Sequence, residues 1–416
     1  MLRLDFPGCL LSWILALLIC SPAIAQQNDA HPGKAIYDRT CAGCHNNPEA
    51  TRAPALSSLR QLHRGTVEYA ITIGYMRMQA SSLSAQERGE LLDWLSLGQK
   101  QNANWFAAAQ CSGKSAEISA AAPVIAPTFG LSASNLRRQN ATDAGLKTAD
   151  FARLELAWAI AFPQTPSMRS QPVIAGNTLF IAATDSGRIF AVDTRSGCMK
   201  WQFESKVPLR SSLSYGSLAP DRPVIVAGDA VGAVVAIDAL TGKQLWRSEI
   251  RLHEANRITG TPVIHKGRVF APLSGVEISY ARLDTYECCK AQGAVVALDL
   301  KTGRQLWVGR TMDPATPQKR NRAGAQLWGP SGAPIWSTPA IDEKRNVLYV
   351  GTGENNSLPV TETSDAIIAF DLDTGNASGC SRRPRETPGI TPADRTAPTA
   401  TSALLPTSSI TILVAR

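Results

Sequence analysis

The stretch AIDALTGKQLW, residues 236–246, is the clearest copy of a repeat that organises most of this 416-residue chain. Two further copies, AVDTRSGCMKW at 191–201 and ALDLKTGRQLW at 297–307, also place an Asp eight residues before a Trp, with a Gly between them. A degenerate first copy keeps the same offset from Asp150 to Trp158. The Asp-to-Gly segment has the chemistry of a hairpin turn, and an apolar β-rich run precedes each clear copy. Apolar strands at short intervals, with one large aromatic residue per unit, predict the blades of a β-propeller.

Each unit also opens with a predicted inner strand, and the inner strands of a propeller line its central channel. The residues that open these strands are therefore expected to face the channel: Arg169, Arg210, Thr259 and Trp336. Acidic residues follow the strands, in loops at one end of the channel: Asp185, Asp229, Glu277 and Glu354. Two arginines, a tryptophan and carboxylates that converge there predict a site for a planar anionic cofactor.

Residues 1–25 have the layout of a secretory signal peptide. Arg3 precedes an apolar run at 10–19, and Ala23-Ile24-Ala25 supplies a small-residue cleavage site. The run is too short to cross a bilayer comfortably, so no membrane span is expected after cleavage; an uncleaved anchor is the alternative. Export predicts a periplasmic protein whose cysteines meet an oxidising compartment.

Residues 26–98 are predicted to form a small all-α cytochrome c domain. Cys41-Ala42-Gly43-Cys44-His45 is the C-x-x-C-H motif that attaches haem c. Cys41 and Cys44 would bind the haem covalently, and His45 would coordinate its iron. A pair of redox-active thiols is the alternative interpretation of the motif.

The second iron ligand is expected to be a thioether or another imidazole. Met76 is preferred because it ends a helical stretch just before the last helix of this domain. Met78 is the rival, and His63 would give a bis-histidine haem. The last helix is expected to begin after Ser84, an N-cap residue followed by Glu87 three positions later.

Residues 99–127 are rich in Ala, Ser and Pro and lack an apolar period, which predicts a linker. Cys111 lies in it without an assigned partner, and the partners of Cys198 and Cys380 are open as well. The chain has 42 Lys and Arg against 34 Asp and Glu, a net charge of +8. Because no run of five basic residues occurs, nucleic acid is not expected as a partner.

Three segments carry a resemblance to a known family: Glu287-Cys288-Cys289 before AQGAVVALDLKTGRQLW, GAQLWGPSGAPIWSTPAID, and LYVGTGENNS. With the Asp-Gly-Trp repeats, they resemble quinoprotein dehydrogenases, which carry pyrroloquinoline quinone (PQQ). The order of haem domain and propeller resembles the cytochrome-containing polyvinyl-alcohol dehydrogenases. The expected fold is therefore an all-α cytochrome c domain followed by an incomplete all-β quinoprotein propeller at residues 128–375.

The resemblance implies oxidation of secondary alcohols, with polyvinyl alcohol as the expected polymer, to ketones. PQQ would pass electrons to haem c and then to an external acceptor such as a soluble cytochrome c. In such quinoproteins a vicinal disulfide packs on one face of the quinone and a tryptophan on the other, which carries over to Cys288, Cys289 and Trp336. A Ca²⁺ ion polarises the quinone carbonyl, and its expected ligands here are Glu354, Asn355 and Glu277. Gln292 departs from the pattern, where an arginine is expected before the glycine.

Each of these residues also has a structural interpretation. Cys288 and Cys289 would then pair elsewhere, for example with Cys198, and Trp336 would belong to the core. Glu354 would be a solvated loop carboxylate, and the two channel arginines would form ordinary ion pairs. Two alternative functions follow, a non-catalytic propeller that acts as a binding scaffold and an inactive fragment of the dehydrogenase.

A fifth copy of the repeat begins as AFDLDTGNASG at residues 369–379, where Gly379 stands at the position of the tryptophan. Residues 376–416 contain no aromatic residue and match no blade, which predicts a disordered tail. A frameshift or truncation near residue 376 is the preferred explanation, and a natural tail is the alternative. The general-base Asp that the resemblance implies would lie beyond this break, so no catalytic base is assigned, and Asp394 lacks the matching context.

Overall fold

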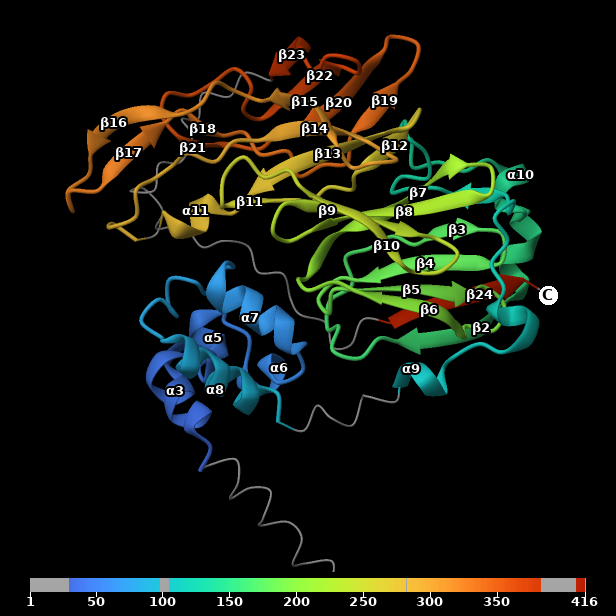
Figure 1. Ribbon diagram of the computed structural model, residues 1–416, viewed down its shortest axis with the longest axis horizontal. Coiled ribbons are helices and arrows are strands. Elements are labelled where there is room, and N and C mark those ends of the chain that lie inside the picture. Colours follow the sequence, from blue (N-terminus) through green and yellow to red (C-terminus); the bar gives the residue numbers. More distant parts are fainter. Residues whose placement is uncertain (1–29, 98–104, 282, 383–408, 416) are drawn as a thin grey trace, which may run out of the picture.

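The computed structural model describes residues 30–97, 105–281, 283–382 and 409–415. Helices form a small N-terminal domain, and antiparallel sheets arranged as propeller blades form the rest (Figure 1). This arrangement confirms the predicted fold class. The predicted signal peptide lies outside the described residues. None of the helices in the described part of the chain has the length and apolar character that crossing a bilayer requires.

The N-terminal domain consists of short helices around one apolar core. Their bounds are α3 Pro32–Thr40, α4 Ala42–His45, α5 Pro48–Thr51, α6 Leu56–Leu59, α7 Arg64–Thr72 and α8 Ala85–Leu95. α8 begins at the predicted N-cap, because the Ser84 hydroxyl accepts from Glu87 N and the Glu87 carboxylate accepts from Ser84 N. The core gathers apolar side chains from α3, α7 and α8: Ile36, Tyr37, Val67, Ile71, Leu91, Leu92, Trp94 and Leu95.

Four sheets of the described chain correspond to blades, and apolar clusters fill the space between neighbouring ones. Blade 1 contains β1 Val124–Ala126, β3 Val173–Ala175, β4 Thr178–Ala183, β5 Arg188–Asp193 and β6 Met199–Glu204. Blade 2 contains β7 Leu209–Ala219, β8 Arg222–Asp229, β9 Ala233–Asp238 and β10 Gln244–Glu249. Blade 3 contains β11 Asn256–Arg257, β12 Val263–His265, β13 Arg268–Gly275, β14 Ala294–Asp299 and β15 Gln305–Arg310. Blade 4 contains β19 Ala340–Asp342, β20 Val347–Gly351, β22 Ala366–Asp371 and β23 Ala377–Arg382.

Shorter elements connect or flank the blades. The strand pairs are β2 Leu154–Ala161 with β24 Ser409–Ala415, β16 Thr316–Arg320 with β17 Gln326–Gly329, and β18 Ser331–Gly332 with β21 Asn355–Ser357. The helices are α9 Trp105–Ala108, η2 Gly113–Ala116, α10 Ala141–Ala144, η3 Thr148–Arg153 and α11 Glu277–Tyr280. Of these, α11 and β18 both contact Ala291, in the loop that follows the vicinal cysteines Cys288 and Cys289.

The repeat tryptophans join consecutive repeat units. Each indole N–H donates to the main-chain oxygen one residue after the repeat Asp of the next unit: Trp158 to Thr194, Trp201 to Ala239, Trp246 to Leu300, and Trp307 to Leu372. The glycine of the same turn lies under the indole ring, and a Cβ on Gly303 would be only 2.6 Å from the Trp246 ring. Hydrogen bonds from Thr302 lower the pKa of Asp299 and hold its turn. The Asp, Gly and Trp of the repeat therefore form a local turn and also the contact between one unit and the next.

The predicted linker is ordered structure from residue 105 onward. Trp105 of α9 packs edge-on against Phe162 and Phe190, and the Cys111 N–H donates to Met199 O of β6. A disulfide between Cys111 and Cys198 fixes the segment to blade 1. Strand β1, at the end of this segment, also pairs with β3. Composition failed to predict this order because contacts with blade 1, rather than an apolar period within the segment, hold it in place.

The predicted tail is also partly structured. Strand β24, at 409–415, pairs antiparallel with β2, which corrects the expectation of disorder there. Residues 377–382 form the last strand of blade 4. In that strand Gly379 lies opposite Ala369, the position that Trp307 occupies opposite Ala297 in blade 3. Blade 4 thus keeps its strand pairing although the docking tryptophan is replaced.

Candidate functional site

The haem-attachment motif lies where α3 ends and α4 begins. The His45 ring is buried, and its Nδ1 atom is 2.6 Å from Pro54 O, so Nδ1 carries the proton and Nε2 is left to coordinate iron. Cys41 and Cys44 are both free thiols. Burial, with a smaller contribution from Cys44, raises the pKa of the Cys41 thiol to about 11, which disfavours a reactive thiolate pair. The geometry supports haem attachment as the role of the motif.

The three candidates for the second iron ligand lie in different surroundings. Met76 packs in the core of the haem domain, which Cys41 also contacts. Met78 instead packs against an apolar cluster of blade 3. His63 is the N-cap of α7, where its Nδ1 accepts from Gly65 N, and its Nε2 is 3.6 Å from a Glu204 carboxylate oxygen. These positions support Met76, whose role as the iron ligand stays a prediction.

A matched pair of variants tests this assignment. Met76→Ala is expected to abolish the methionine-to-iron charge-transfer absorption of the ferric haem and to lower its reduction potential, because a thioether ligand raises that potential. Met78→Ala is expected to keep both properties, since Met78 faces the propeller. Absorption spectra and a redox titration measure both, and the reverse pattern would assign the iron to Met78.

The inner segments of neighbouring blades lie side by side. Gln171 N donates to Ser212 Oγ at 2.8 Å, which joins the segments that carry Arg169 and Arg210. Thr261 N donates to Thr338 Oγ1 at 3.1 Å, which joins the segments that carry Thr259 and Trp336. The Ser214 hydroxyl links blade 2 to blade 3 through Pro262 O at 2.5 Å. The structure therefore brings together the four segments that the sequence assigned to the channel wall.

Arg169 and Arg210 form an electropositive pair. Desolvation and the neighbouring Arg210 charge lower the pKa of Arg169, while Asp185 acts in the opposite direction. Burial raises the pKa of Asp185, whose carboxylate accepts from Ser167 N at 2.9 Å. One partly desolvated carboxylate balances two guanidinium groups, so the pair favours an anionic ligand. Asp229, by contrast, is committed to an ion pair with Arg247 at 2.7 Å.

Trp336 and Thr259 have the properties of ligand-binding residues. Trp336 is 64% exposed, which rules out the interpretation that it belongs to the core. A Cβ on Gly353 would lie 3.1 Å from the Trp336 Nε1 atom, so the glycine leaves room for the indole. The Thr259 Oγ1 atom is buried and has no hydrogen-bond partner in the described part of the chain. An exposed indole, an orphaned hydroxyl and two guanidinium groups fit a planar polyanion such as PQQ.

Cys288 and Cys289 form a disulfide with each other, and Cys198 pairs with Cys111, so the alternative pairing is wrong. The vicinal pair is buried in a small cluster with Ala281, Tyr286 and Leu327. It is held against strand β17, because the Cys288 main-chain oxygen accepts from Trp328 N at 2.7 Å. Direct contact between the disulfide and a quinone stays a prediction.

Glu277 is fully buried at the start of α11. Its carboxylate accepts from Lys290 N at 2.8 and 2.9 Å, from Ala291 N at 2.6 Å, and from the Tyr286 hydroxyl at 3.1 Å. These donors compensate its charge without a cation. Glu277 therefore anchors the loop that follows the vicinal cysteines.

The expected calcium ligands are not assembled. Asn355 uses its amide within its own loop, since Nδ2 donates to Ser357 O and Pro359 O while Oδ1 accepts from Thr361 N and Oγ1. As the side chain is placed here, its amide is occupied by these bonds, and a calcium-binding role for Asn355 stays a prediction. Glu354 is partly buried, and its main-chain oxygen accepts from Ala333 N at 2.8 Å. The described residues contain no group of three acidic, His or Cys side chains able to hold a metal. As these side chains are placed, they do not form a calcium site, and Ca²⁺ binding stays a prediction.

Two features of the site escaped prediction. Arg310 Nη1 donates to Gln292 Oε1 at 3.4 Å, so a guanidinium group reaches the position where the resemblance implied an arginine. The segment before the first repeat crosses the inner strands, because Gly130 N donates to Gln171 Oε1 and the Asn135 amide donates to Thr338 O. Its sequence carries no periodic signal, and only the long-range contacts reveal it.

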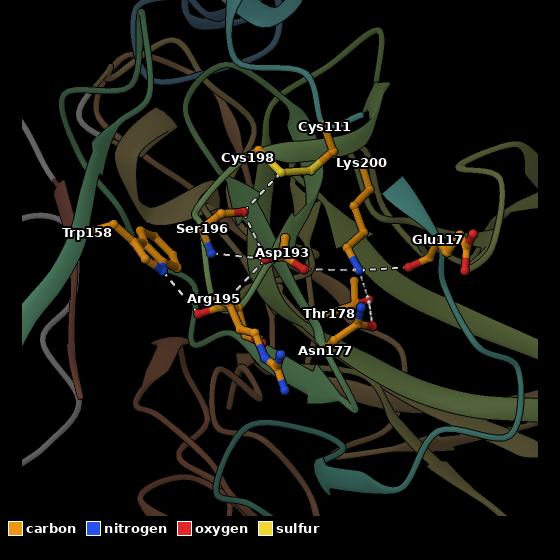
Figure 2. Close-up of polar contacts among 11 residues, drawn as sticks. Cys111, Glu117, Trp158, Asn177, Thr178, Asp193, Arg195, Ser196, Cys198 and Lys200 are labelled. Atoms are coloured by element: carbon orange, nitrogen blue, oxygen red, sulfur yellow. Dashed lines mark hydrogen bonds and ion pairs between the residues drawn. A yellow bond between two sulfur atoms is a disulfide. The ribbon is translucent and has the colours of Figure 1, made fainter. Parts of the chain in front are cut away.

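The disulfide between Cys111 and Cys198 stands beside a buried lysine (Figure 2). Lys200 donates to Glu117 O and Thr178 Oγ1, each at 2.9 Å, and lies 3.7 Å from the Asp193 carboxylate. Desolvation lowers the pKa of Lys200, against the pull of Asp193. The disulfide and the Glu117 contact join the segment before the repeats to blade 1, and the other two contacts lie within blade 1, so this cluster is structural.

Two family models match the chain. Residues 137–378 match the model PQQ, described as the β-propeller domain of glucose, ethanol and alcohol dehydrogenases. Residues 28–95 match the model described as cytochrome C oxidase, cbb3-type, subunit III. The two matches follow the same order as the helical domain and the blades. They support haem c and PQQ as the cofactors.

Two curated relatives extend over most of the chain. It is 34% identical to a polyvinylalcohol dehydrogenase of Pseudomonas sp over 87% of this chain and 58% of the relative. It is 32% identical to a polyvinylalcohol dehydrogenase of Sphingopyxis sp. (strain 113P3) over 83% of this chain and 55% of the relative. The chain thus spans a little over half the length of these relatives.

Among solved structures, the quinohemoprotein alcohol dehydrogenase from Comamonas testosteroni aligns with a TM-score of 0.48 and 21% identity, over 68% of this chain and 45% of that chain. The family assignment rests on the sequence models, of which the propeller model alone covers more than half of the chain. The chain therefore belongs to the family of the PQQ β-propeller domain of glucose, ethanol and alcohol dehydrogenases, with a cytochrome domain in front.

Proposed function

We propose that this chain supplies the haem domain and the quinone-binding blades of an exported dehydrogenase that oxidises secondary alcohols, including those of polyvinyl alcohol, to ketones. Bound at the channel wall, PQQ would serve as the oxidant that takes two electrons from each alcohol. Arg169 and Arg210 would hold its carboxylates, the Thr259 hydroxyl would donate to one of its oxygens, and Trp336 would stack on its ring. The vicinal Cys288–Cys289 disulfide would cover the opposite face.

The observation that carries this proposal is that the haem domain contacts the propeller beside the arginine pair. Thr66 of α7 donates to Asp185 O, and the Asp185 carboxylate is an electrostatic neighbour of Arg169 and Arg210. The predicted sites for the two redox groups would then lie on either side of this interface, which supports an electron path from the quinone site to haem c and on to an external acceptor such as a soluble cytochrome c.

Export agrees with the disulfide between Cys111 and Cys198, which are 87 residues apart. Disulfides of this kind form and persist in oxidising compartments such as the periplasm. Calcium has no step in the proposal, because Asn355 is committed to its loop and Glu277 is compensated by main-chain donors.

The proposal is tested by loading the haem-containing chain with PQQ, with and without Ca²⁺, and supplying alcohols with a dye that takes electrons directly from the quinone site. Dye reduction is expected with secondary alcohols and with polyvinyl alcohol oligomers. PQQ binding without turnover of any alcohol would overturn the proposal and leave a binding scaffold. Turnover only with added Ca²⁺ would show that Glu277 or Glu354 rearranges to bind the ion.

A further inference from the structure

The haem domain contacts the propeller through α7 and the residues that follow it, and Figure 1 shows α7 on the side that faces the blades. The polar contacts reach three blades: Thr66 to Asp185, Tyr69 to Ala230, and Ile73 to both Arg257 and Tyr280. An apolar contact joins Met78 to a cluster of blade 3 that contains Ala255, Val276, Tyr280 and Ala291. An exposed ion pair between Arg77 and Glu254, at 2.9 Å, lies at the edge.

Arg257 is the centre of this interface. It is only 2% exposed, and all five of its N–H groups donate. The acceptors are neutral oxygens of both domains: the Tyr69 hydroxyl, Ile73 O, Glu254 O, Asn256 O and the Tyr280 hydroxyl. A guanidinium group fits this arrangement because its donors point in a fixed planar fork. The Arg257 side chain thus forms hydrogen bonds to the haem domain and to the propeller at the same time.

The contacts of Arg257 end close to both predicted redox sites. On one side, Ile73 is three residues before Met76, the predicted iron ligand. On the other side, the Tyr280 hydroxyl donates to Ile73 O at 2.8 Å and accepts from Arg257 at 3.2 Å. Tyr280 ends α11, whose first residue, Glu277, anchors the loop after the vicinal cysteines. One hydrogen-bonded cluster, made by Ile73, Arg257 and Tyr280, therefore lies between the segments that carry the two predicted sites.

We propose that Arg257 is a positioning residue that holds the haem domain at the quinone site and thereby sets the rate of electron transfer between them. The part concerning electron transfer rests on the proposed function. Each alcohol oxidised to a ketone releases two electrons and two protons, and each electron reduces one ferric haem to the ferrous state. The external acceptor must therefore reoxidise the haem between the two electrons.

Arg257→Lys is the informative variant, because it keeps the positive charge and loses the fork. The lysine would leave some of the five acceptors buried without a donor in the docked state. This loss would lower the ratio of docked to undocked haem domain by roughly tenfold to a hundredfold. Tyr280→Phe removes one link of the same cluster and is expected to act in the same direction with a smaller effect. Glu254→Gln is the matched control, since it breaks only the ion pair to Arg77 at the exposed edge.

The first measurement is amide hydrogen exchange over residues 64–78, which needs neither PQQ nor turnover. Protection is expected to fall in Arg257→Lys and to stay unchanged in Glu254→Gln. The second measurement is the ratio of haem reduction to direct dye reduction with alcohol as the substrate. This ratio is expected to fall about tenfold or more in Arg257→Lys while dye reduction itself is retained.

Unchanged protection in Arg257→Lys would overturn the positioning role. An equal loss of haem and dye reduction would also overturn it, because the damage would then lie in the quinone site. If the parent chain reduces neither dye nor haem, the proposed function fails, and hydrogen exchange still decides whether Arg257 docks the two domains.

Discussion

Gly303→Ala is expected to destabilise the propeller by about 2–5 kcal/mol, because one added methyl group brings both a steric clash and backbone strain. The new Cβ would lie 2.6 Å from the Trp246 ring and 2.5 Å from Ser248 Oγ. The backbone of residue 303 has φ +71°, a conformation that is strained for any residue other than glycine. The variant therefore forces apart the tryptophan contact that joins blades 2 and 3.

Gly267→Ala is the matched control for this prediction. Gly267 lies in the same blade at φ +72°, yet a Cβ there meets nothing within 4 Å. Backbone strain alone is expected to cost about 1–2 kcal/mol. Urea unfolding followed by tryptophan fluorescence compares the two variants. Equal destabilisation would contradict the docking role of Trp246.

Trp336→Ala is expected to weaken PQQ binding by about 2 kcal/mol or more, roughly thirtyfold in Kd. Trp336 is 64% exposed, so its loss removes a stacking surface and little of the core. The midpoint of urea unfolding is therefore expected to be the same as in the parent chain. Equilibrium dialysis of the quinone against the haem-loaded chain measures the change in Kd.

Two variants make this result specific to the indole. Trp336→Phe keeps an aromatic face and is expected to recover part of the affinity. Ile367→Ala removes another exposed apolar side chain of blade 4 and is expected to leave Kd unchanged. If Trp336→Ala bound PQQ as tightly as the parent chain, the indole would have no place in the quinone site.

The repeat was predictable because its determinants lie within eleven residues. In AIDALTGKQLW the Asp238 carboxylate holds its own turn, and Gly242 provides a positive φ. The partner of each tryptophan is then fixed by the next copy, so the contact between blades follows from the spacing. The same locality made the N-cap at Ser84 predictable.

Contacts between distant segments were beyond prediction from the sequence. The pairing of Cys111 with Cys198 and that of β24 with β2 depend on how the blades are stacked. The role of Arg257 could not be predicted, because its two acceptors in the haem domain, Tyr69 and Ile73, lie more than 180 residues earlier in the chain. The neighbouring positions of the inner segments that carry Arg169, Arg210, Thr259 and Trp336 were predictable from the repeat. The hydrogen bonds of Asn355 within its own loop were not, since they depend on Thr361 and Pro359.

The central claim, that one chain joins an alcohol-oxidising quinone site to a haem, is tested most directly by haem absorbance after alcohol is added to the PQQ-loaded ferric chain. Reduction of the haem is expected with a first-order rate that does not depend on protein concentration, because the haem domain contacts the blades that carry the predicted quinone site. No reduction with any secondary alcohol would contradict the account. A rate that rises in proportion to protein concentration would contradict the internal electron path.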